Sequence, residues 1–182
     1  MLINERAEFE LAARLREGGA PLGEIFTFLS GLYFRGKIAY ALAFARPPKG
    51  WPGAFVITTN RGLLPPNTPM TLSELRQLGT VGIEATDPRY SEPLQRDAAN
   101  LAALSSCEIV LLGSVASGKY VDPLLPLLGE RLRFPAEFVG RGDMSRGGLM
   151  LRRAASGEEL SYITVAGAVR RGTRPPKLEP RR

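Results

Sequence analysis

Short apolar runs alternate with segments of helical periodicity from residue 24 to residue 135, and this alternation constrains the fold more than any other feature of the sequence. The runs 54–58 and 109–112 are continuously apolar, as strands are when helices cover both faces of a sheet. Helical spacing lies between them, most regularly over 91–104. Strands that alternate with helices predict an α/β fold, so we expect a single three-layer α/β/α domain built on a mainly parallel sheet.

The remaining elements follow from the same patterns and from local caps. Thr71 and Glu74 fit a capping box, which predicts the start of a short helix through Leu78. The other expected helices cover 2–17, 37–45 and 120–128, and the other expected strands cover 24–29, 80–85 and 131–134, with antiparallel strands near the C-terminus at 149–153 and 160–165. A chain of 182 residues suffices for one domain with a sizeable core, which we expect over 1–167, followed by a tail over 168–182.

The tail carries most of the net charge of the chain. Six basic residues and one acidic residue lie after position 167, so the tail supplies five of the six net positive charges. Its prolines predict an extended segment that cannot build core. Two interpretations stay open, a solvated terminus and an electrostatic contact for nucleic acid.

The residue types that the chain lacks exclude several kinds of chemistry. There is no histidine and a single cysteine, Cys107, so Ser-His-Asp and Cys-His nucleophiles and histidine-bound metals are excluded. We therefore expect no metal and no cofactor, and any acid–base work falls to Asp, Glu, Lys or Tyr. The charged, periodic start of the chain and the lack of a long apolar run predict a cytoplasmic protein without a membrane partner.

A glycine loop follows the apolar run 109–112 directly. Residues 113–119 have the spacing G-x-x-x-x-G-K, whose backbone N–H groups can surround a phosphate. Tyr120 stands where a nucleotide hydrolase needs Ser or Thr to hold magnesium, so we predict anion binding without hydrolysis. The predicted cradle consists of Gly113, Ser114, Ser117, Gly118 and Lys119. The alternative is that the glycines only turn a strand into a helix and that Lys119 is solvated.

A second glycine-rich loop, 140–148, carries two arginines and one acid. Arg141 and Arg146 could grip a phosphate or carboxylate in a bidentate manner. Asp143 between them is the candidate acid–base residue. The alternative is a flexible loop whose charges face water.

Other cationic residues are expected at the same sheet edge. Ligands of open α/β sheets bind beyond the carboxyl ends of the strands, where the loops 30–37, 58–62 and 113–119 would meet. These loops add Arg35, Lys37 and Arg61 to the predicted site.

Three segments carry a resemblance to known proteins: 30–37 (SGLYFRGK), 57–65 (ITTNRGLLP) and 110–114 (VLLGS). They resemble uncharacterised bacterial α/β proteins and, more distantly, uracil-DNA-glycosylase-like domains, including one in archaeosine-synthesis enzymes. The resemblance spans about residues 25 to 150 and implies a three-layer α/β/α fold that handles nucleobases. The chain has no histidine of the kind that many of those glycosylases use, so no catalytic residue is carried over.

The predicted function is the binding of a phosphate-containing ligand, either a nucleotide or a nucleic acid. If the protein is catalytic, the expected reaction is at a nucleobase, glycosidic bond or phosphate-linked carbon, with Asp143 as the acid–base group. The alternative is a non-enzymatic interaction protein, such as a homo-oligomer subunit, in which the glycine loops are structural.

Overall fold

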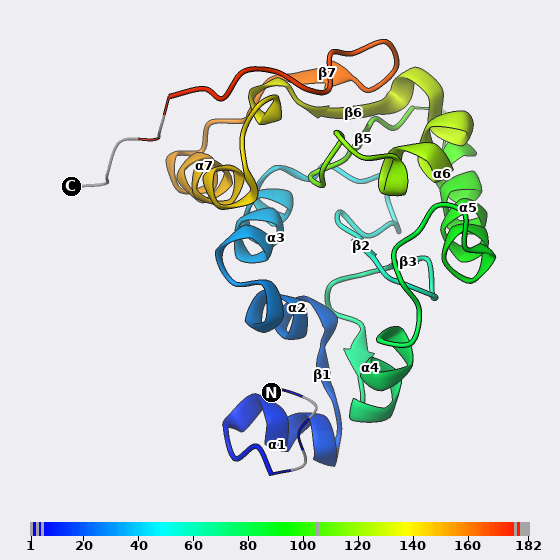
Figure 1. The fold of residues 1–182 in the computed structure, drawn as a ribbon, viewed down its shortest axis with the longest axis vertical. Helices are drawn as coiled ribbons and strands as arrows, with labels where there is room; N and C mark the ends of the chain where they lie inside the picture. The colour runs from blue at the N-terminus through cyan, green and yellow to red at the C-terminus, as the bar shows by residue number, and fades with distance from the viewer. Residues whose placement is uncertain (1, 3, 5, 105, 177, 179–182) are drawn as a thin grey trace.

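The computed structural model describes residues 1–182 except 1, 3, 5, 105, 177 and 179–182. The predicted mixed α/β character is confirmed (Figure 1). The helices are α1 (Glu10–Glu17), α2 (Leu22–Ser30), α3 (Leu32–Phe44), α4 (Leu72–Leu78), α5 (Pro88–Ala102), α6 (Gly118–Leu128) and α7 (Asp143–Ser156), with 3-10 turns η1 (Gly129–Arg131) and η2 (Ala136–Phe138). The strands are β1 (Ala20–Pro21), β2 (Val56–Ile57), β3 (Leu63–Leu64), β4 (Pro69–Met70), β5 (Ile109–Val110), β6 (Leu132–Pro135) and β7 (Tyr162–Thr164).

The strands form small separate sheets, and this corrects the predicted topology. β1 pairs with β4 and β2 pairs with β3, both antiparallel. β6 lies between β5, which is parallel to it, and β7, which is antiparallel. Over the described residues, β5–β6 is thus the one parallel pairing, and the structure does not contain the expected three-layer arrangement on a mainly parallel sheet. The expected antiparallel strand near the C-terminus is present as β7.

Several apolar runs of strand length lie in helices. The expected strand 24–29 belongs to α2, the expected strand 149–153 belongs to α7, and 80–85 contains no strand. Length and apolarity cannot distinguish a short strand from a helix that is buried on one side. The loops predicted at 30–37 and 140–148 are also largely helical, because α3 begins at Leu32 and α7 begins at Asp143.

The elements with clear periodicity or caps lie where the sequence predicts them. α5, α6 and β6 match the expected ranges within a few residues. Thr71 Oγ1 accepts a hydrogen bond from the Glu74 N–H at 3.3 Å, and the Thr71 N–H donates to the Glu74 carboxylate at 2.8 Å, so the capping box is confirmed. The first helix is shorter than expected and begins at Glu10.

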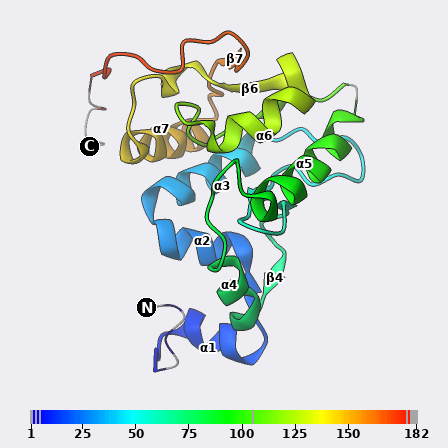
Figure 2. The same ribbon diagram turned by 45° about the vertical axis from the view of Figure 1, so that its right-hand side comes forward.

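Buried side chains form two hydrophobic cores. The smaller core joins α1, α2, α4, β1 and β4 and includes Leu15, Leu22 and Met70. The larger core joins α3, α5, α6, α7 and β6 and includes Leu94 and Leu132. α1 and α4 lie at one end of the molecule, whereas α5, α6, α7 and β6 lie at the other end (Figure 1, Figure 2).

α3 and α7 lie side by side (Figure 2). Their backbones are in direct contact at a pair of glycines. A Cβ atom on Gly36 would lie 2.6 Å from the Gly147 carbonyl oxygen. A Cβ atom on Gly147 would lie 2.8 Å from both the Leu32 carbonyl oxygen and Tyr33 Cα. These separations are shorter than van der Waals contact, so only glycine allows the crossing. It places the first turn of α7 against the first two turns of α3.

The described part of the tail is extended, as expected, and it contacts the rest of the molecule. The Arg141 guanidinium donates to the Pro176 carbonyl oxygen at 3.4 Å, and the Arg171 guanidinium donates to the Ala116 carbonyl oxygen at 3.4 Å. Leu178 packs against the larger core. Within the described residues, no helix has the length and apolarity required to cross a membrane.

Candidate functional site

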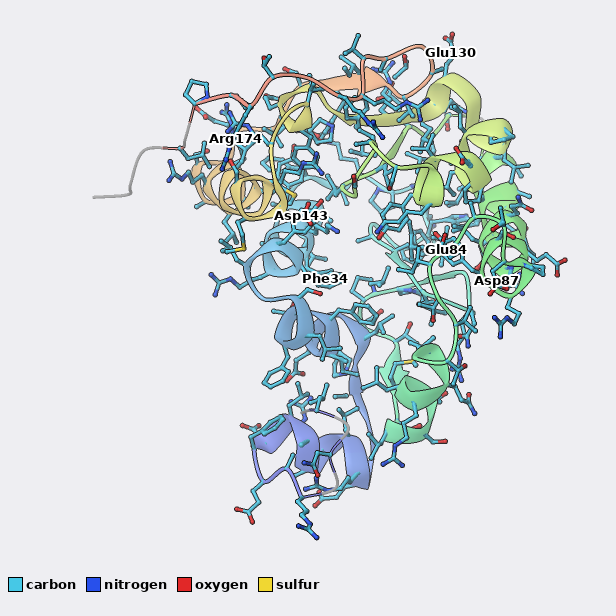
Figure 3. All side chains as sticks on the ribbon, viewed as in Figure 1. Phe34, Glu84, Asp87, Glu130, Asp143 and Arg174 are labelled. Atoms are coloured by element: carbon cyan, nitrogen blue, oxygen red, sulfur yellow. The ribbon has the colours of Figure 1, made fainter. Side chains whose placement is uncertain are left out.

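Four charged side chains from three helices lie close enough to influence one another. α3 supplies Lys37, the first turn of α6 supplies Lys119, and the first turn of α7 supplies Asp143 and Arg146. The charges of the other three all act on the pKa of Lys37. Asp143 lies at the end of α7 next to α3, the helix that carries Phe34 (Figure 3). We call these four residues the charged cluster.

Lys37 is the member of the charged cluster whose ionisation is most perturbed. Burial, followed by the nearby Arg146 and Lys119 charges, lowers its pKa to about 8, while Asp143 opposes the shift. The ammonium nitrogen lies 4.0 Å from the centroid of the Tyr33 ring. Among the described residues, this ammonium makes neither an ion pair nor a hydrogen bond. A half-buried cation in this state has donors left for a ligand.

Arg146 is the deepest member of the charged cluster, with 6% of its surface exposed. Its Nη2 donates to the Phe138 carbonyl oxygen at 3.1 Å, and its Nη1 lies 3.7 Å from Asp143 Oδ1. The Nε atom is buried and has no partner among the described groups. Buried guanidinium donors are normally satisfied, so this arginine is short of acceptors.

Two tyrosines hold the elements that carry the charged cluster. The Tyr33 hydroxyl donates to the Leu112 carbonyl oxygen at 3.3 Å, and burial raises its pKa to about 12 against the opposing effect of Arg146. The Tyr90 hydroxyl donates to the Lys119 carbonyl oxygen at 2.8 Å, which ties α5 to the first turn of α6. Tyr90 was not predicted as a site residue, because no spacing in the sequence links it to the loop 29 positions away.

The glycine loop has features of both an anion cradle and a structural turn. Within the described chain, the backbone N–H groups of residues 114–117 donate to no protein acceptor, and the Ser117 hydroxyl is buried without a partner. These groups could receive an anion. Gly113, however, packs closely on the Tyr120 ring, and the Asp122 carboxylate lies where a Cβ atom of Gly118 would be. The Asp122 carboxylate limits the approach of an anion from that side.

A large cavity opens beside the charged cluster. It has a volume of about 770 Å³, within the range of small-molecule sites. Lys37 and Tyr120 form part of its wall and connect it to the charged cluster. The lining is mainly apolar and rich in rings, from Phe26, Phe34, Tyr40, Phe44, Trp51, Phe55, Tyr120 and Tyr162.

A chain of hydrogen bonds lies in another part of the cavity wall. The hydroxyls of Tyr40 and Tyr162 are 2.6 Å apart, Tyr162 donates to Glu159 at 2.9 Å, and Arg46 pairs with Glu159 at 2.8 Å. Because the Leu160 N–H donates to the Tyr40 oxygen and Tyr162 uses its proton on Glu159, Tyr40 must donate to Tyr162. The tyrosines are 122 positions apart in the chain, so no sequence motif could reveal them.

The other predicted cations have structural partners or face elsewhere. Arg61 donates to Glu74 at 2.8 Å and to Gln77 at 3.1 Å, both on α4. Arg35 is exposed and lies two positions before Lys37 on α3, which puts it on a different face of the helix. Arg141 bonds Ser145 and the tail. The structure therefore brings Lys37, Lys119, Asp143 and Arg146 together and leaves Arg35 and Arg61 apart from them.

Metal-binding groups and similar proteins were both sought for this site. The described residues contain no group of three or more His, Cys, Asp or Glu side chains that could hold a metal ion. No protein-family model matches the chain, and neither curated proteins nor solved structures show a significant match to it.

Proposed function

We propose that the protein binds a phosphate-containing ligand of the nucleotide type, with the phosphate at the charged cluster and the planar ring in the cavity. One observation carries the proposal: Lys37, at the edge of a cavity lined by rings, feels the charges of two other cations, Arg146 and Lys119, and of one carboxylate, Asp143. The site residues are Lys37, Lys119 and Arg146, helped by the loop from Gly113 to Gly118.

The charge balance of the cluster favours an anion. Asp143 is the one carboxylate that acts on Lys37 among the described groups, whereas two cations, Arg146 and Lys119, act on it with the opposite sign. Its distance of 3.7 Å from Arg146 makes a weak ion pair. A phosphate would supply the missing acceptors for Lys37 and for the loop N–H groups, and charge-assisted hydrogen bonds of this kind are the strong ones.

The cavity favours a flat, apolar body attached to that anion. Aromatic side chains stack on nucleobases with little dependence on the base, and such stacking contributes about 1–3 kcal/mol per base. Trp51, Phe55 and Tyr120 offer such surfaces in the cavity wall. A nucleotide combines both chemical features, whereas inorganic phosphate has one of them.

Catalysis forms a separate part of the proposal. Asp143 remains the candidate acid–base residue, since its side chain is 63% exposed and can meet a ligand. The alternative, a non-enzymatic interaction protein with structural glycines, is favoured by one observation, the contact of the Asp122 carboxylate with Gly118.

The test is a thermal-shift and equilibrium-binding series with inorganic phosphate, nucleoside monophosphates and the matching nucleosides. We expect nucleotides to bind best, and Lys119→Ala to weaken their binding by about tenfold, which corresponds to about 1.4 kcal/mol. Lys49→Ala, which removes an exposed lysine of the 45–55 connection, is the matched control and should bind normally. Absence of stabilisation by every phosphate compound would overturn the proposal in favour of the alternative.

The tail separates a mononucleotide from a nucleic acid as the ligand. A basic arm adds affinity for a polyanion by releasing counterions and adds little for a ligand held in a cavity. Deletion of residues 170–182 should weaken DNA or RNA binding and flatten its salt dependence, while mononucleotide binding stays unchanged. If the truncated chain binds nucleic acid with the same affinity and salt slope, the tail is no nucleic-acid contact.

A further inference from the structure

Lys37 has a position that phosphate binding does not fully explain. Lys37 lines the cavity, whereas Asp143, Arg146 and Lys119, whose charges act on it, are not lining residues. Lys37 is therefore the member of the charged cluster that also borders the space where the body of a ligand would be. Among the described residues it has no ion-pair partner that would hold it in the protonated state.

We propose that Lys37 is a nucleophilic amine that forms an imine with an aldehyde or ketone group of a ligand in the cavity. The inference goes beyond ligand binding and rests on the proposed function only for the anchoring of a phosphate on the same ligand. The substrate class is a phosphorylated carbonyl compound whose carbonyl carbon lies within reach of Lys37 when its phosphate lies at the charged cluster.

The surroundings of Lys37 favour its neutral, nucleophilic form. Burial and the charges of Arg146 on α7 and Lys119 on α6 lower its pKa to about 8, and Asp143 is the opposing charge. At pH 7 about a tenth of such an amine is neutral, compared with fewer than about one in a thousand for an ordinary lysine. The Tyr33 ring, 4.0 Å from the nitrogen, supports the protonated form, and the Tyr33 hydroxyl is engaged by Leu112.

The reaction balances without an external oxidant or reductant. The neutral amine attacks the carbonyl carbon, a nitrogen–carbon bond forms, and the π electron pair moves to the oxygen, which takes up a proton. The nitrogen, cationic after the attack, gives up one proton to form the carbinolamine. The carbinolamine then loses its hydroxyl group as water, with a proton supplied by an acid, while the nitrogen lone pair forms the carbon–nitrogen double bond, and loss of the second nitrogen proton leaves the neutral imine. Asp143 is the nearby carboxyl group that can carry these protons.

The α3–α7 crossing fixes this arrangement. Gly36 precedes Lys37, and its contact with Gly147 keeps the first turn of α7 beside the amine. Arg146 directly precedes Gly147, and its side chain is 7% exposed, so its charge cannot move away into solvent. The cation that disfavours protonation of Lys37 is thus held in place by packing.

Reductive trapping tests the inference in the full-length protein. The chain contains four lysines, at positions 37, 49, 119 and 177, so a peptide mass map assigns every adduct to one residue. Pyridoxal phosphate and pyridoxal are the probes, each followed by borohydride, which supplies the hydride that converts the imine to a stable secondary amine. We expect pyridoxal phosphate to label Lys37 at least about tenfold faster than exposed Lys49 at pH 7, with a rate that rises with pH up to a midpoint near 8.

The outcomes separate this inference from the proposed function. Labelling of Lys37 by pyridoxal phosphate much faster than by pyridoxal supports both the amine and the phosphate anchor. Equal labelling by the two probes supports the amine and counts against the anchor. Labelling of Lys49 or Lys119 as fast as Lys37 in the wild-type protein overturns the inference, and so does unchanged adduct stoichiometry in Lys37→Met, whatever the nucleotide titration shows.

Discussion

Charged residues beside the smaller core are paired, whereas those of the charged cluster at the cavity edge are not paired in the same way. In the smaller, N-terminal core region, Arg14 pairs with Glu24 and Arg61 pairs with Glu74, each at 2.8 Å. At the edge of the cavity, Lys37 and Lys119 form no ion pair with described residues, and the Arg146–Asp143 contact is 3.7 Å long. A short ion pair with a carboxylate thus marks the cations that stabilise the fold, and its absence marks the cations that can bind a ligand. Arg61 and Lys119 look alike in the sequence and belong to different classes.

Truncation of one leucine in each core should have the largest effect. Leu22 and Leu132 are both fully buried, and replacement of such a leucine by alanine costs about 2–5 kcal/mol in the free energy of unfolding. We expect Leu22→Ala and Leu132→Ala to unfold at lower urea concentrations. Because Leu132 also lines the cavity, it alone should weaken nucleotide binding under native conditions. Equal loss of binding in Leu22→Ala would show that the two regions do not divide structure from function.

Two adjacent glycines of α7 should respond to alanine in opposite directions. Gly147→Ala forces a Cβ atom to within 2.8 Å of the α3 backbone, and such overpacking costs about 1–3 kcal/mol. At Gly148 the nearest atom would be Leu178 Cδ1 at 3.6 Å, so Gly148→Ala should stabilise the helix by up to about 1 kcal/mol. Urea unfolding of both variants measures the two changes in the free energy of unfolding. Stabilisation by Gly147→Ala would mean that the crossing is wider than described.

Loss of the Arg61–Glu74 pair should have the smallest effect, a change in how the free energy of unfolding depends on pH below about 4.5. The backbone hydrogen bond from Thr71, followed by the Arg61 contact, lowers the pKa of Glu74 to about 2 from its ordinary value of 4.5. A carboxyl whose pKa is lowered by folding stabilises the protein above its unfolded pKa, and this contribution is lost as pH falls from 4.5 towards 2.

Glu74→Gln tests this by removing that part of the pH dependence. The change should stay below about 1 kcal/mol, since the pair is partly exposed to solvent. Arg61→Met removes one of the partners of Glu74, so it should reduce the acid dependence of stability by less than Glu74→Gln does. Nucleotide binding should stay normal. Loss of nucleotide binding in Arg61→Met would contradict the assignment of Arg61 to the structural class.

The fold was predictable where the signal is local. α5 and α6 follow helical periodicity. The capping box of α4 joins two residues that are only three positions apart in the sequence. The strand predicted over 24–29 was wrong for a physical reason. The run is mostly apolar, yet Ile25 is 0% exposed while Leu29 is 53% exposed, as on a helix with one buried side. Phe28 stacks on Phe9, the residue before α1, with ring centroids 5.0 Å apart, so part of the outer face of α2 is covered by another side chain. Apolarity alone could not show that this segment is a helix with one buried side.

The site was predictable as a set of residue types and not as an arrangement. The glycine loops drew attention to Lys119, Asp143 and Arg146 for a phosphate cradle at a sheet edge. The structure gathers them through helices, because the Gly36–Gly147 contact brings α7 to Lys37. Isolated glycines carry no sequence signal that names their partner, and the tyrosines of the cavity wall come from distant positions. Tertiary packing decided which cations meet.

The glycine pair at the α3–α7 crossing also restricts how this sequence can evolve. In most packed cores a larger side chain on one element can be offset by a smaller one on its neighbour. Here each glycine opposes main-chain atoms, since Gly36 faces the Gly147 backbone and Gly147 faces the backbone of Leu32 and Tyr33. No second substitution can shrink a backbone, so a change at either position has no compensating partner. Lineages that keep this crossing should therefore keep both glycines, even where the surrounding side chains diverge.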